Sequence, residues 1–365
     1  MKIGLEAKRA FVNASGLGSY ARNLITGLEQ YTTHDLYLFT PSFKRSLFSP
    51  SAKIIKGKSG TLWRSFFQTQ DIRKSGVEVY HGLSHELPFG IHKLSIKKIV
   101  TIHDLIFMRY PQQFSFIDRF IFKQKILYAC KYADKIIALC EQTKNDLIDF
   151  LKVPLDKIVI HHQPIDSTYF IKHSQPEITS LLLSYQIKKP YWLSVGTLNT
   201  RKNAKTLIEA YAKSQSMRDL DLVLIGAGGA YRHECIKLAQ LLKIEKKVHF
   251  LSNVTNEKLP FFYQGSFAFV LPSLFEGWGL PVVEAQASGK ATIVSDNSSF
   301  PESAGSHSLF VDPMNRWDLQ ERMDELYHNS AIRIKIEQKS LEYAKMFHLQ
   351  VTSKKLESIY QKTML

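Results

Sequence analysis

Two glutamates eight positions apart, with glycines and a proline between them, form the stretch of this sequence best suited to chemistry. The stretch reads FEGWGLPVVE over residues 275–284, so that Glu276 and Glu284 enclose Gly277 and Gly279. Glycine lets the backbone approach a ligand closely, because it carries no Cβ atom. Two carboxylates beside such a loop suit a sugar that is attached to a phosphate.

The flanking residues predict that this loop joins a strand to a helix. Residues 266–271 (SFAFVL) are expected to form a short buried strand, and residues 282–288 a helix. Backbone amides near Gly279 and Leu280 would then face an anion at the helix N-terminus, with Glu284 in the first turn. An ordinary turn with a glutamate that favours the helix dipole is the alternative, but such a turn does not require both carboxylates.

Composition and charge describe a globular chain with a basic first half. The 365 residues suffice for two or three domains, and residues 1–175 hold 25 Lys and Arg against 14 Asp and Glu, a net of +11 out of +15. Nucleic acid, anionic lipid head groups or a phosphorylated acceptor would be attracted to that half, or the charge serves solubility alone. No apolar run reaches the roughly 18 residues of a membrane span.

The N-terminus and the cysteines predict a cytoplasmic protein. Residues 1–5 read directly as a strand and not as a signal peptide. The three cysteines show neither a ligand spacing nor an even framework, and are expected to be buried free thiols of a reduced compartment.

The chain contains two successive series of alternating strands and helices. This pattern predicts an α/β protein with two Rossmann-like doubly wound domains. The first domain is expected over residues 1–172 and the second over 173–350, with a polar segment between them. A C-terminal helix at 351–365 is expected to cross back onto the first domain. Ligand sites of the two domains would then face each other across a cleft.

Two places in the first domain carry candidate binding groups. Gly16 and Gly18 open a helix after the first strand, in a pattern that lets a ligand or a second domain come close. His103 follows the strand at 98–102, at the strand end where parallel sheets bind ligands, and Asp104 is placed to orient its ring. A histidine buried for packing is the ordinary alternative.

In the second domain, Arg201 and Lys202 lie in the loop after the first strand, just before a helix. With the amides of the glutamate loop they could neutralise a diphosphate, whose negative charge grows as a glycosidic bond breaks. Asp219 and Asp221 form a D-x-D pattern, but they precede the strand at 222–225 and so lie at the wrong end of it. We therefore predict no metal site.

Residues 52–73 are rich in both basic and aromatic side chains, among them Lys58, Trp63 and Phe66. Such a segment can bind single-stranded nucleic acid or a membrane surface. An ordinary amphipathic helix over residues 62–72 is the alternative that we weigh slightly higher.

These residues together resemble a family 4 retaining glycosyltransferase of the GT-B fold, similar to bacterial mannosyltransferases. The most specific match is the E-x7-E motif from Glu276 to Glu284, inside PSLFEGWGLPVVEAQASG. The supporting matches are the glycine loop at 16–18, VTIHDL at 100–105, ADKIIALCEQTKNDL at 133–147 and VGTLNTRKN at 195–203.

The resemblance implies transfer of a hexose, mannose or glucose, from a GDP- or UDP-linked donor. The expected acceptor is a glycan or a lipid-diphosphate-linked acceptor in surface polysaccharide biosynthesis, such as that of lipopolysaccharide. We expect no metal and no cofactor, and a cytoplasmic location at the inner face of the membrane. The basic first half predicts peripheral contact with anionic lipid, and nucleic acid is not an expected partner. The alternative is a catalytically inactive nucleotide-sugar or nucleic-acid binding module of the same fold.

The resemblance also assigns roles to single residues. Glu276 would contact the donor sugar near its anomeric carbon, without forming a covalent bond, and Glu284 the ribose hydroxyls. Lys202 with Arg201 would bind the diphosphate, and His103 would lie near the donor sugar. Gly16 and Gly18 would contact the donor or the acceptor. Gly277, Gly279 and Leu280 would contact the donor, and Ser252 and Asn253 its nucleobase.

Two positions depart from the family pattern. Thr197 stands where many members have an arginine directly after a glycine, and we expect Arg201 to compensate. Gln163 and Pro164 stand where an Asn-Gly pair is usual.

Overall fold

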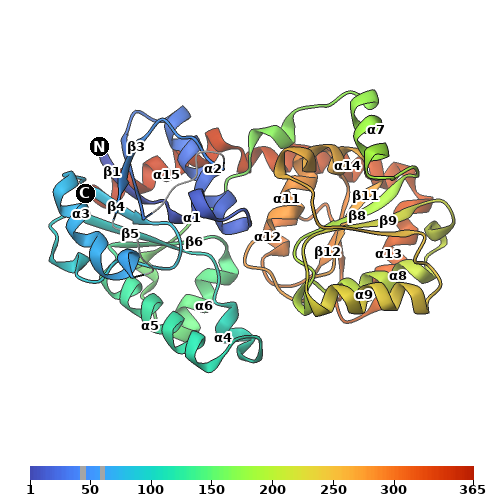
Figure 1. Cartoon of the computed structure of the whole chain (residues 1–365), viewed down its shortest axis with the longest axis horizontal. Coiled ribbons are helices and arrows are strands. Elements are labelled where there is room, and N and C mark those ends of the chain that lie inside the picture. Colours follow the sequence, from blue (N-terminus) through green and yellow to red (C-terminus); the bar gives the residue numbers. More distant parts are fainter. Residues whose placement is uncertain (42–46, 58–61) are drawn as a thin grey trace. The chain divides into compact units, whose positions relative to one another are not determined.

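The computed structural model describes residues 1–41, 47–57 and 62–365, which divide into two compact units. The first unit consists of Met1–Asp166 with Phe347–Leu365, and the second consists of Ser167–Met346. Each unit has its own parallel sheet with helices packed around it (Figure 1). Lys58, part of the basic and aromatic segment, lies outside the described residues.

In the first unit, the described residues form a seven-stranded parallel sheet in the order β3-β2-β1-β4-β5-β6-β7. The direction in which the chain adds strands reverses between β1 and β4, which makes this the switch point of a doubly wound sheet. The strands are β1 (Lys2–Glu6), β2 (Asp35–Thr40), β3 (Lys53–Lys56), β4 (Val79–Gly82), β5 (Lys97–Ile102), β6 (Lys135–Ala138) and β7 (Ile158–Ile160).

The helices of this unit cover the sheet, and a single π-helical turn, η1 (Trp63–Phe67), precedes one of them. They are α1 (Lys8–Val12), α2 (Gly16–Tyr31), α3 (Gln68–Ser75), α4 (Ile106–Arg109), α5 (Phe116–Tyr132), α6 (Glu141–Leu151) and α15 (Leu349–Met364). The helix expected over 62–72 is present, but its first turn is the π-helical η1 and α3 continues it to Ser75. Earlier in the same segment, Lys53–Lys56 form the edge strand β3.

The second unit repeats the architecture, with a six-stranded parallel sheet in the order β10-β9-β8-β11-β12-β13. Its switch point lies between β8 and β11. The strands are β8 (Tyr191–Val195), β9 (Asp221–Ile225), β10 (Val248–Leu251), β11 (Ala268–Leu271), β12 (Thr292–Ser295) and β13 (Leu309–Val311). The helices are α7 (Gln175–Ser184), α8 (Ala204–Lys213), α9 (Ala230–Leu241), α10 (Leu259–Gly265), α11 (Leu280–Ala287), α12 (Phe300–Ala304), α13 (Arg316–His328) and α14 (Ser330–Ala344).

Four of the inner strands are buried along their whole length, which explains why they read as continuous apolar runs and not as alternating ones. Every residue of β4, β9, β11 and β12 is buried. Helices cover both faces of a parallel sheet, so neither face can be polar. The predicted fold class of two Rossmann-like doubly wound domains is confirmed by the two parallel sheets and their strand orders. Among the described residues, no helix has the length and apolar character to cross a membrane.

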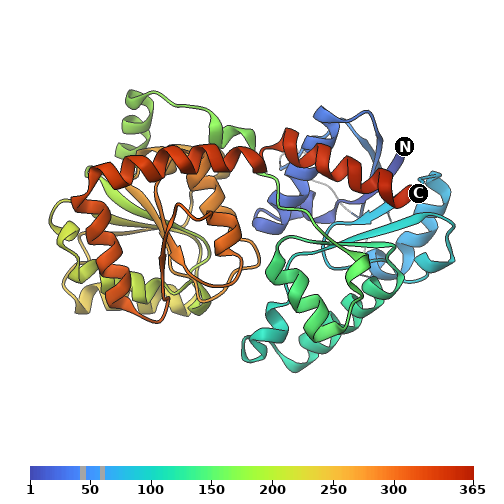
Figure 2. The same cartoon turned by 180° about the vertical axis from the view of Figure 1, so that it is seen from behind.

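A chain of buried hydrogen bonds ties the C-terminal helix to the first sheet. The Tyr360 hydroxyl of α15 shares a 2.8 Å hydrogen bond with His81 Nδ1 of β4, and His81 Nε2 lies 2.8 Å from Thr101 Oγ1 of β5. Thr101 Oγ1 is also 2.9 Å from the Tyr20 hydroxyl of α2. Helices α2 and α15 lie side by side (Figure 2), and a Cβ atom on Gly27 would come within 2.2 Å of Ser353 Oγ.

We expect Tyr360→Phe to lower the free energy of unfolding of the first unit by about 1–2 kcal/mol. The substitution leaves buried His81 Nδ1 without its partner, and an unsatisfied buried polar atom costs about that much. Urea unfolding followed by near-ultraviolet circular dichroism measures the change. Tyr132→Phe, which removes a hydroxyl that makes no described hydrogen bond, is the control and should change stability by less than about 0.5 kcal/mol. Equal effects of the two substitutions would contradict this account.

Candidate active site

The loops that follow β8 and β11 bring three of the predicted site residues together at the switch point of the second sheet. Glu276 Oε2 lies 2.9 Å from Arg201 Nη1, and Glu276 Oε1 lies 2.7 Å from Lys202 Nζ. Only 8% of the Glu276 side chain is exposed to solvent, against 18% for Arg201 and 11% for Lys202. The sequence did not indicate that the predicted sugar-binding carboxylate and the predicted phosphate-binding cations would neutralise one another.

The charges of this ion cluster fix the protonation state of Glu276. Burial of the carboxyl favours its neutral form, but the Lys202 ammonium and the Arg201 guanidinium outweigh burial and hold the pKa of Glu276 at about 2. Burial also lowers the pKa of Lys202, while Glu276 opposes that shift. Glu276 is therefore an anion throughout the physiological range, with no proton to donate.

Four successive backbone carbonyls before the glycine loop each accept a hydrogen bond from a side chain. Ser295 Oγ donates to Ser273 O at 2.7 Å, and Asn297 Nδ2 donates to Leu274 O at 3.2 Å. Arg201 Nη1 donates to Phe275 O at 2.5 Å, and Ser299 Oγ to Glu276 O at 3.1 Å. The Glu276 amide in turn donates to Ser298 Oγ at 3.1 Å.

The loop after β12 therefore positions Glu276, and this support was missed from the sequence. The run Ser-Asp-Asn-Ser-Ser at 295–299, which begins at the carboxyl end of a strand, is the signal that could have indicated it. Ser298 adopts a left-handed backbone with φ of 54°, an uncommon conformation for a residue other than glycine.

The backbone of the Lys202 loop is arranged to let that side chain reach Glu276. Gly196 has a φ of 143°, and a Cβ atom there would lie 3.1 Å from Lys202 Cε. Asn199 Oδ1 accepts from the Lys202 amide at 3.1 Å, which holds the turn. Thr197, which replaces the usual arginine, is exposed, whereas Arg201 contacts Glu276 directly.

The glycine loop ends where α11 begins, two residues earlier than expected. Gly279 is the N-cap in a left-handed conformation with φ of 88°, and Leu280 is the first helical residue. Glu284 consequently lies in the second turn, and the prediction that it lies in the first turn is wrong. Glu284 as a whole is 8% exposed, and its carboxylate accepts a 2.8 Å hydrogen bond from the buried Tyr263 hydroxyl. Gly277 lies partly exposed within the loop.

Ser252 and Asn253 lie apart from this cluster. They are exposed residues directly after β10, an edge strand that β9 separates from β8. No described hydrogen bond or ion pair joins either residue to the Glu276 loop. Their contact with a nucleobase stays a prediction.

His103 lies in the first unit, directly after β5. Its Nε2 atom is 2.8 Å from Leu83 O, a carbonyl that can only accept, so the ring proton is assigned to Nε2. Burial and the neighbouring His85 lower the pKa of His103 to about 3. The prediction that Asp104 orients the ring is wrong, because Leu83 holds it, while Asp104 Oδ1 accepts from the Ile106 amide at 3.1 Å.

The neutral tautomer leaves His103 Nδ1 as a lone-pair acceptor. Nδ1 has no hydrogen-bond partner among the described residues and is not among the fully buried polar atoms. Tyr20 of α2 packs edge-on against the ring, with centroids 4.6 Å apart. His103 is thus placed to accept a hydrogen bond from a hydroxyl group.

Gly16 and Gly18 differ in what they do. A Cβ atom at Gly18 would lie 1.7 Å from Asn13 O, so glycine is required there by the turn between α1 and α2. Gly16 is exposed and its Cβ position is open, so a side chain would fit within the described structure. The contact of Gly16 with a donor or an acceptor stays a prediction.

A second cluster of charges, which the sequence reading missed, lies at the switch point of the first sheet. Arg64 of η1 lies 3.0 Å from Glu6, at the end of β1, and 3.3 Å from Glu86, after β4. Lys125 of α5 lies 3.2 Å from the same Glu86 carboxylate. Both carboxylates are buried. The four residues are far apart in sequence, and no local motif links them.

Arg9 and His85 lie in the electrostatic field of this cluster. Burial and the nearby Arg64 charge lower the pKa of Arg9, and the Arg9 side chain makes no ion pair or hydrogen bond within the described ranges. Burial, Arg64 and Arg9 lower the pKa of His85 to about 3. His85 has a left-handed φ of 61°, and its ring centroid lies 5.1 Å from that of His103.

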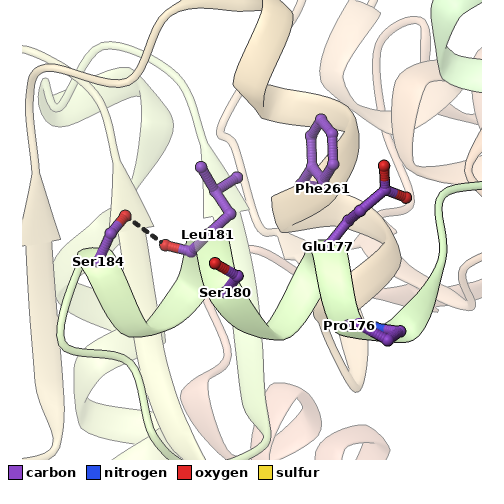
Figure 3. A pocket seen from close by; sticks show the side chains of 6 residues that line it. All are labelled: Pro176, Glu177, Ser180, Leu181, Ser184 and Phe261. Atoms are coloured by element: carbon purple, nitrogen blue, oxygen red, sulfur yellow. Dashed lines mark hydrogen bonds between the residues drawn. The ribbon is translucent and has the colours of Figure 1, made fainter.

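Two other features of the second unit lie outside the Glu276 cluster. A surface hollow on α7 is lined by Pro176, Glu177, Ser180, Leu181, Ser184 and Phe261, none of them a predicted site residue (Figure 3). Asp221 begins β9 and contacts His249 at 2.9 Å, while Asp219 accepts a hydrogen bond from Tyr327. Among the described residues, no group of three or more His, Cys, Asp or Glu side chains is arranged to hold a metal ion.

Glu276→Gln is expected to lower the free energy of unfolding of the second unit by about 3 kcal/mol at pH 7. The substitution leaves two buried cations without their counter-ion. Because the folded pKa of Glu276 is depressed to about 2, the carboxylate stabilises fully above about pH 5 and loses this effect as the pH falls towards 2. When the pH is lowered from about 5 to 2, the free energy of unfolding should therefore fall less for Glu276→Gln than for the wild type.

Urea unfolding at a series of pH values measures both effects. Glu342→Gln is the control, since it removes a highly exposed carboxylate paired with Lys345 and should cost less than about 1 kcal/mol. Wild-type stability in Glu276→Gln at pH 7 would show that the ion cluster does not stabilise the unit.

Two protein-family models match most of the chain. The model described as "Glycosyltransferase Family 4" matches residues 14–169, and the model described as "Glycosyl transferases group 1" matches residues 184–345. The first match lies in the unit that contains His103, and the second lies in the unit that contains Glu276.

Curated relatives include two O-antigen mannosyltransferases. O-antigen chain mannosyltransferase B of Escherichia coli is 30% identical over 239 residues, covering 64% of this chain and 61% of the relative. O-antigen chain mannosyltransferase RfbU of Salmonella typhimurium is 26% identical over 214 residues, covering 59% of this chain and 56% of the relative. The matches thus span less than two thirds of these relatives' lengths.

Solved structures show the same fold over the whole chain. HepE of Anabaena, in complex with UDP and glucose, has a TM-score of 0.79 at 14% sequence identity, covering 99% of this chain and 100% of that structure. The resemblance to glycosyltransferases of family 4 and the GT-B fold, drawn from the sequence motifs, is confirmed. Because both domain models match in order along a fold shared with solved glycosyltransferases, the chain belongs to the glycosyltransferases of the GT-B fold, with a family 4 domain followed by a group 1 domain.

Proposed function

We propose that this glycosyltransferase moves a hexose, with retention of anomeric configuration, from a nucleotide-diphosphate sugar to a glycan or lipid-linked acceptor. The observation that carries the proposal is the pair of largely buried cations, Arg201 and Lys202, gathered by Glu276 at the switch point of the second sheet. Sheets of this kind bind ligands at that point, and two adjacent cations suit a diphosphate. The complex of HepE with UDP and glucose supports the nucleotide part of the proposal.

In the proposed reaction the acceptor hydroxyl attacks the anomeric carbon from the face that the leaving group occupies. The new bond joins the acceptor oxygen to that carbon, the bond to the β-phosphate oxygen breaks, and the hydroxyl proton passes to the leaving phosphate. Negative charge grows on the diphosphate, and Arg201 and Lys202 stabilise it. These cations supply the neutralisation that a divalent metal would otherwise supply, so no metal is proposed.

Glu276 has the properties of an electrostatic and positioning group. A carboxyl with a pKa of about 2 cannot act as a general acid at neutral pH. Its two cationic partners also withdraw electron density from the carboxylate, which argues against a covalent glycosyl intermediate. We propose that it orients the cations and stabilises positive charge at the anomeric carbon.

His103 is proposed to accept a hydrogen bond from a hydroxyl of the donor sugar through Nδ1. The Leu83 carbonyl fixes the tautomer, and the low pKa keeps the ring neutral, so Nδ1 accepts at any physiological pH. Glu284, held by Tyr263, is proposed to bind the ribose hydroxyls.

The donor and acceptor are proposed from the relatives. The names of the Escherichia coli and Salmonella relatives favour mannose and surface polysaccharide as product, with GDP-mannose ahead of UDP-glucose. We place the reaction at the cytoplasmic face of the membrane that carries a lipid-linked acceptor.

The direct test begins with a thermal-shift screen of GDP- and UDP-sugars. A donor at about 100 times its Kd should stabilise the protein by about 2.7 kcal/mol. Incubation with that donor and a mannan or lipid-linked acceptor should release nucleoside diphosphate, in EDTA as well as without it, and NMR should show the donor's anomeric configuration in the product. Lys202→Ala should lower kcat at least about 100-fold. Binding without turnover would indicate an inactive binding module, and an inverted product would refute retention.

We further expect Glu276→Gln to bind the free nucleoside diphosphate more tightly than the wild type, although it loses transfer. In the unliganded protein, Glu276 competes with the diphosphate for Arg201 and Lys202. Removal of one negative charge a few ångströms from the ligand should strengthen binding about tenfold at low salt.

Isothermal titration calorimetry measures the affinity at two ionic strengths. Glu302→Gln is the control, because this half-buried residue of α12 lies outside the ion cluster. Weaker binding by Glu276→Gln than by the wild type would show that the cations do not bind the diphosphate, and would contradict the site assignment.

A further inference from the structure

Tyr263 of α10 (Leu259–Gly265) is a buried residue that contacts the proposed donor site without belonging to the predicted site residues. Tyr263 is 0% exposed, and its hydroxyl donates a 2.8 Å hydrogen bond to Glu284 Oε2. Glu284 lies in the second turn of α11 (Leu280–Ala287), which packs against α10. A buried tyrosine hydroxyl usually has a hydrogen-bond partner, but here the partner is the carboxylate that is proposed to bind the ribose.

The packing around the Tyr263 ring fixes the direction of its hydroxyl. The ring centroid lies 5.6 Å from that of Phe269 in β11 and 5.8 Å from that of Tyr169 in η5 (Ser167–Phe170). Both contacts are inclined, with ring planes at 51° and 69°. Ser266 holds the end of α10, because its hydroxyl donates to Tyr263 O at 2.7 Å. Ring and backbone are therefore both held in place before any ligand binds.

The hydrogen bond between Tyr263 and Glu284 has one direction only. Burial, together with the Glu284 charge, raises the pKa of Tyr263 well above its usual value, so the hydroxyl keeps its proton at every physiological pH. An ionised carboxylate accepts hydrogen bonds and cannot donate one. The hydroxyl is therefore always the donor, and the charge on its acceptor strengthens the bond.

Glu284 needs such a support because the Lys202 ammonium attracts the same carboxylate. The Glu284 charge acts on Lys202, where it opposes the fall in pKa that burial causes. Glu276 already lies 2.7 Å from that ammonium. A glutamate side chain has several staggered rotamers, so a carboxylate without support can turn in more than one direction. A Glu284 that turned towards Lys202 would be lost to the ribose and would compete with the diphosphate.

We infer that Tyr263 is a positioning residue, which directs the Glu284 carboxylate at the ribose hydroxyls of the donor and makes the site select ribonucleotides over deoxyribonucleotides. A site that hydrogen-bonds a substrate hydroxyl rejects analogues that lack it, because its own polar group is then left unpaired. That selection weakens when the polar group is free to turn elsewhere. The role rests on the proposed function, because it requires that Glu284 binds the ribose of a nucleoside diphosphate.

Isothermal titration calorimetry of the full-length protein with GDP, UDP and their 2′,3′-dideoxy analogues tests this role. We expect the wild type to bind the better ribonucleotide at least about tenfold more tightly than its dideoxy analogue. In Tyr263→Phe this preference should fall below about threefold, and adding Tyr263→Phe to Glu284→Ala should change it no further. In transfer assays Tyr263→Phe should raise the donor KM severalfold and keep kcat within about twofold, because the ribose lies away from the bond that breaks.

Tyr191→Phe is the matched control. Tyr191 is also 0% exposed, and its hydroxyl donates a 2.7 Å hydrogen bond to Phe262 O of the same helix α10. No described hydrogen bond joins Tyr191 to Glu284. Tyr191→Phe should therefore lower stability but keep the wild-type preference for the ribonucleotide. Circular dichroism and thermal unfolding check that both variants fold.

Three outcomes would overturn this role of Tyr263. Folded Tyr263→Phe protein that keeps the full preference, while the wild type transfers sugar, would show that Tyr263 only fills space and would leave the proposed function intact. Equal loss of preference in Tyr191→Phe would assign the effect to a general loosening of α10. Wild-type protein that binds neither GDP nor UDP would refute the proposed donor, and the role of Tyr263 with it.

Discussion

The contact between Glu276 and the cations Arg201 and Lys202 is the interaction around which the second unit is arranged. Three charges can lie in a largely buried place only because each has a counter-charge within about 3 Å. The surrounding backbone serves this arrangement: Gly196 leaves room for the Lys202 side chain, and side chains of the loop at 295–299 support the carbonyls next to Glu276. A site held in this way is pre-organised before any ligand arrives.

Both units place their charge clusters at the same point of their topology, the position where strand order reverses. In the second unit the cluster has a net positive charge and suits an anionic diphosphate. In the first, Arg64 and Lys125 balance the charges of Glu6 and Glu86. The neutral His103 ring lies near His85 of this region, and it can accept a hydrogen bond from a hydroxyl group but cannot act as an acid. One architecture thus supports two kinds of chemistry, because the side chains at the strand ends differ.

The first unit carries two features that the reaction does not require. Its C-terminal helix is fastened through a buried chain of hydroxyl and imidazole groups from Tyr360 to Tyr20. Its helix α5 exposes apolar and basic side chains together.

The sequence by itself determined the two Rossmann-like domains, since fully buried parallel strands leave apolar runs that alternate with helices. It also located Glu276, Arg201, Lys202 and His103, because glycine, proline and charge at strand ends are local signals. The tertiary structure alone decided that Glu276 neutralises both cations, that Leu83 and not Asp104 orients His103, and that Arg64 joins Glu6 to Glu86. These partners lie 20 to 75 positions apart in the chain and meet only when parallel strands align their carboxyl ends, so no spacing within the sequence could reveal them.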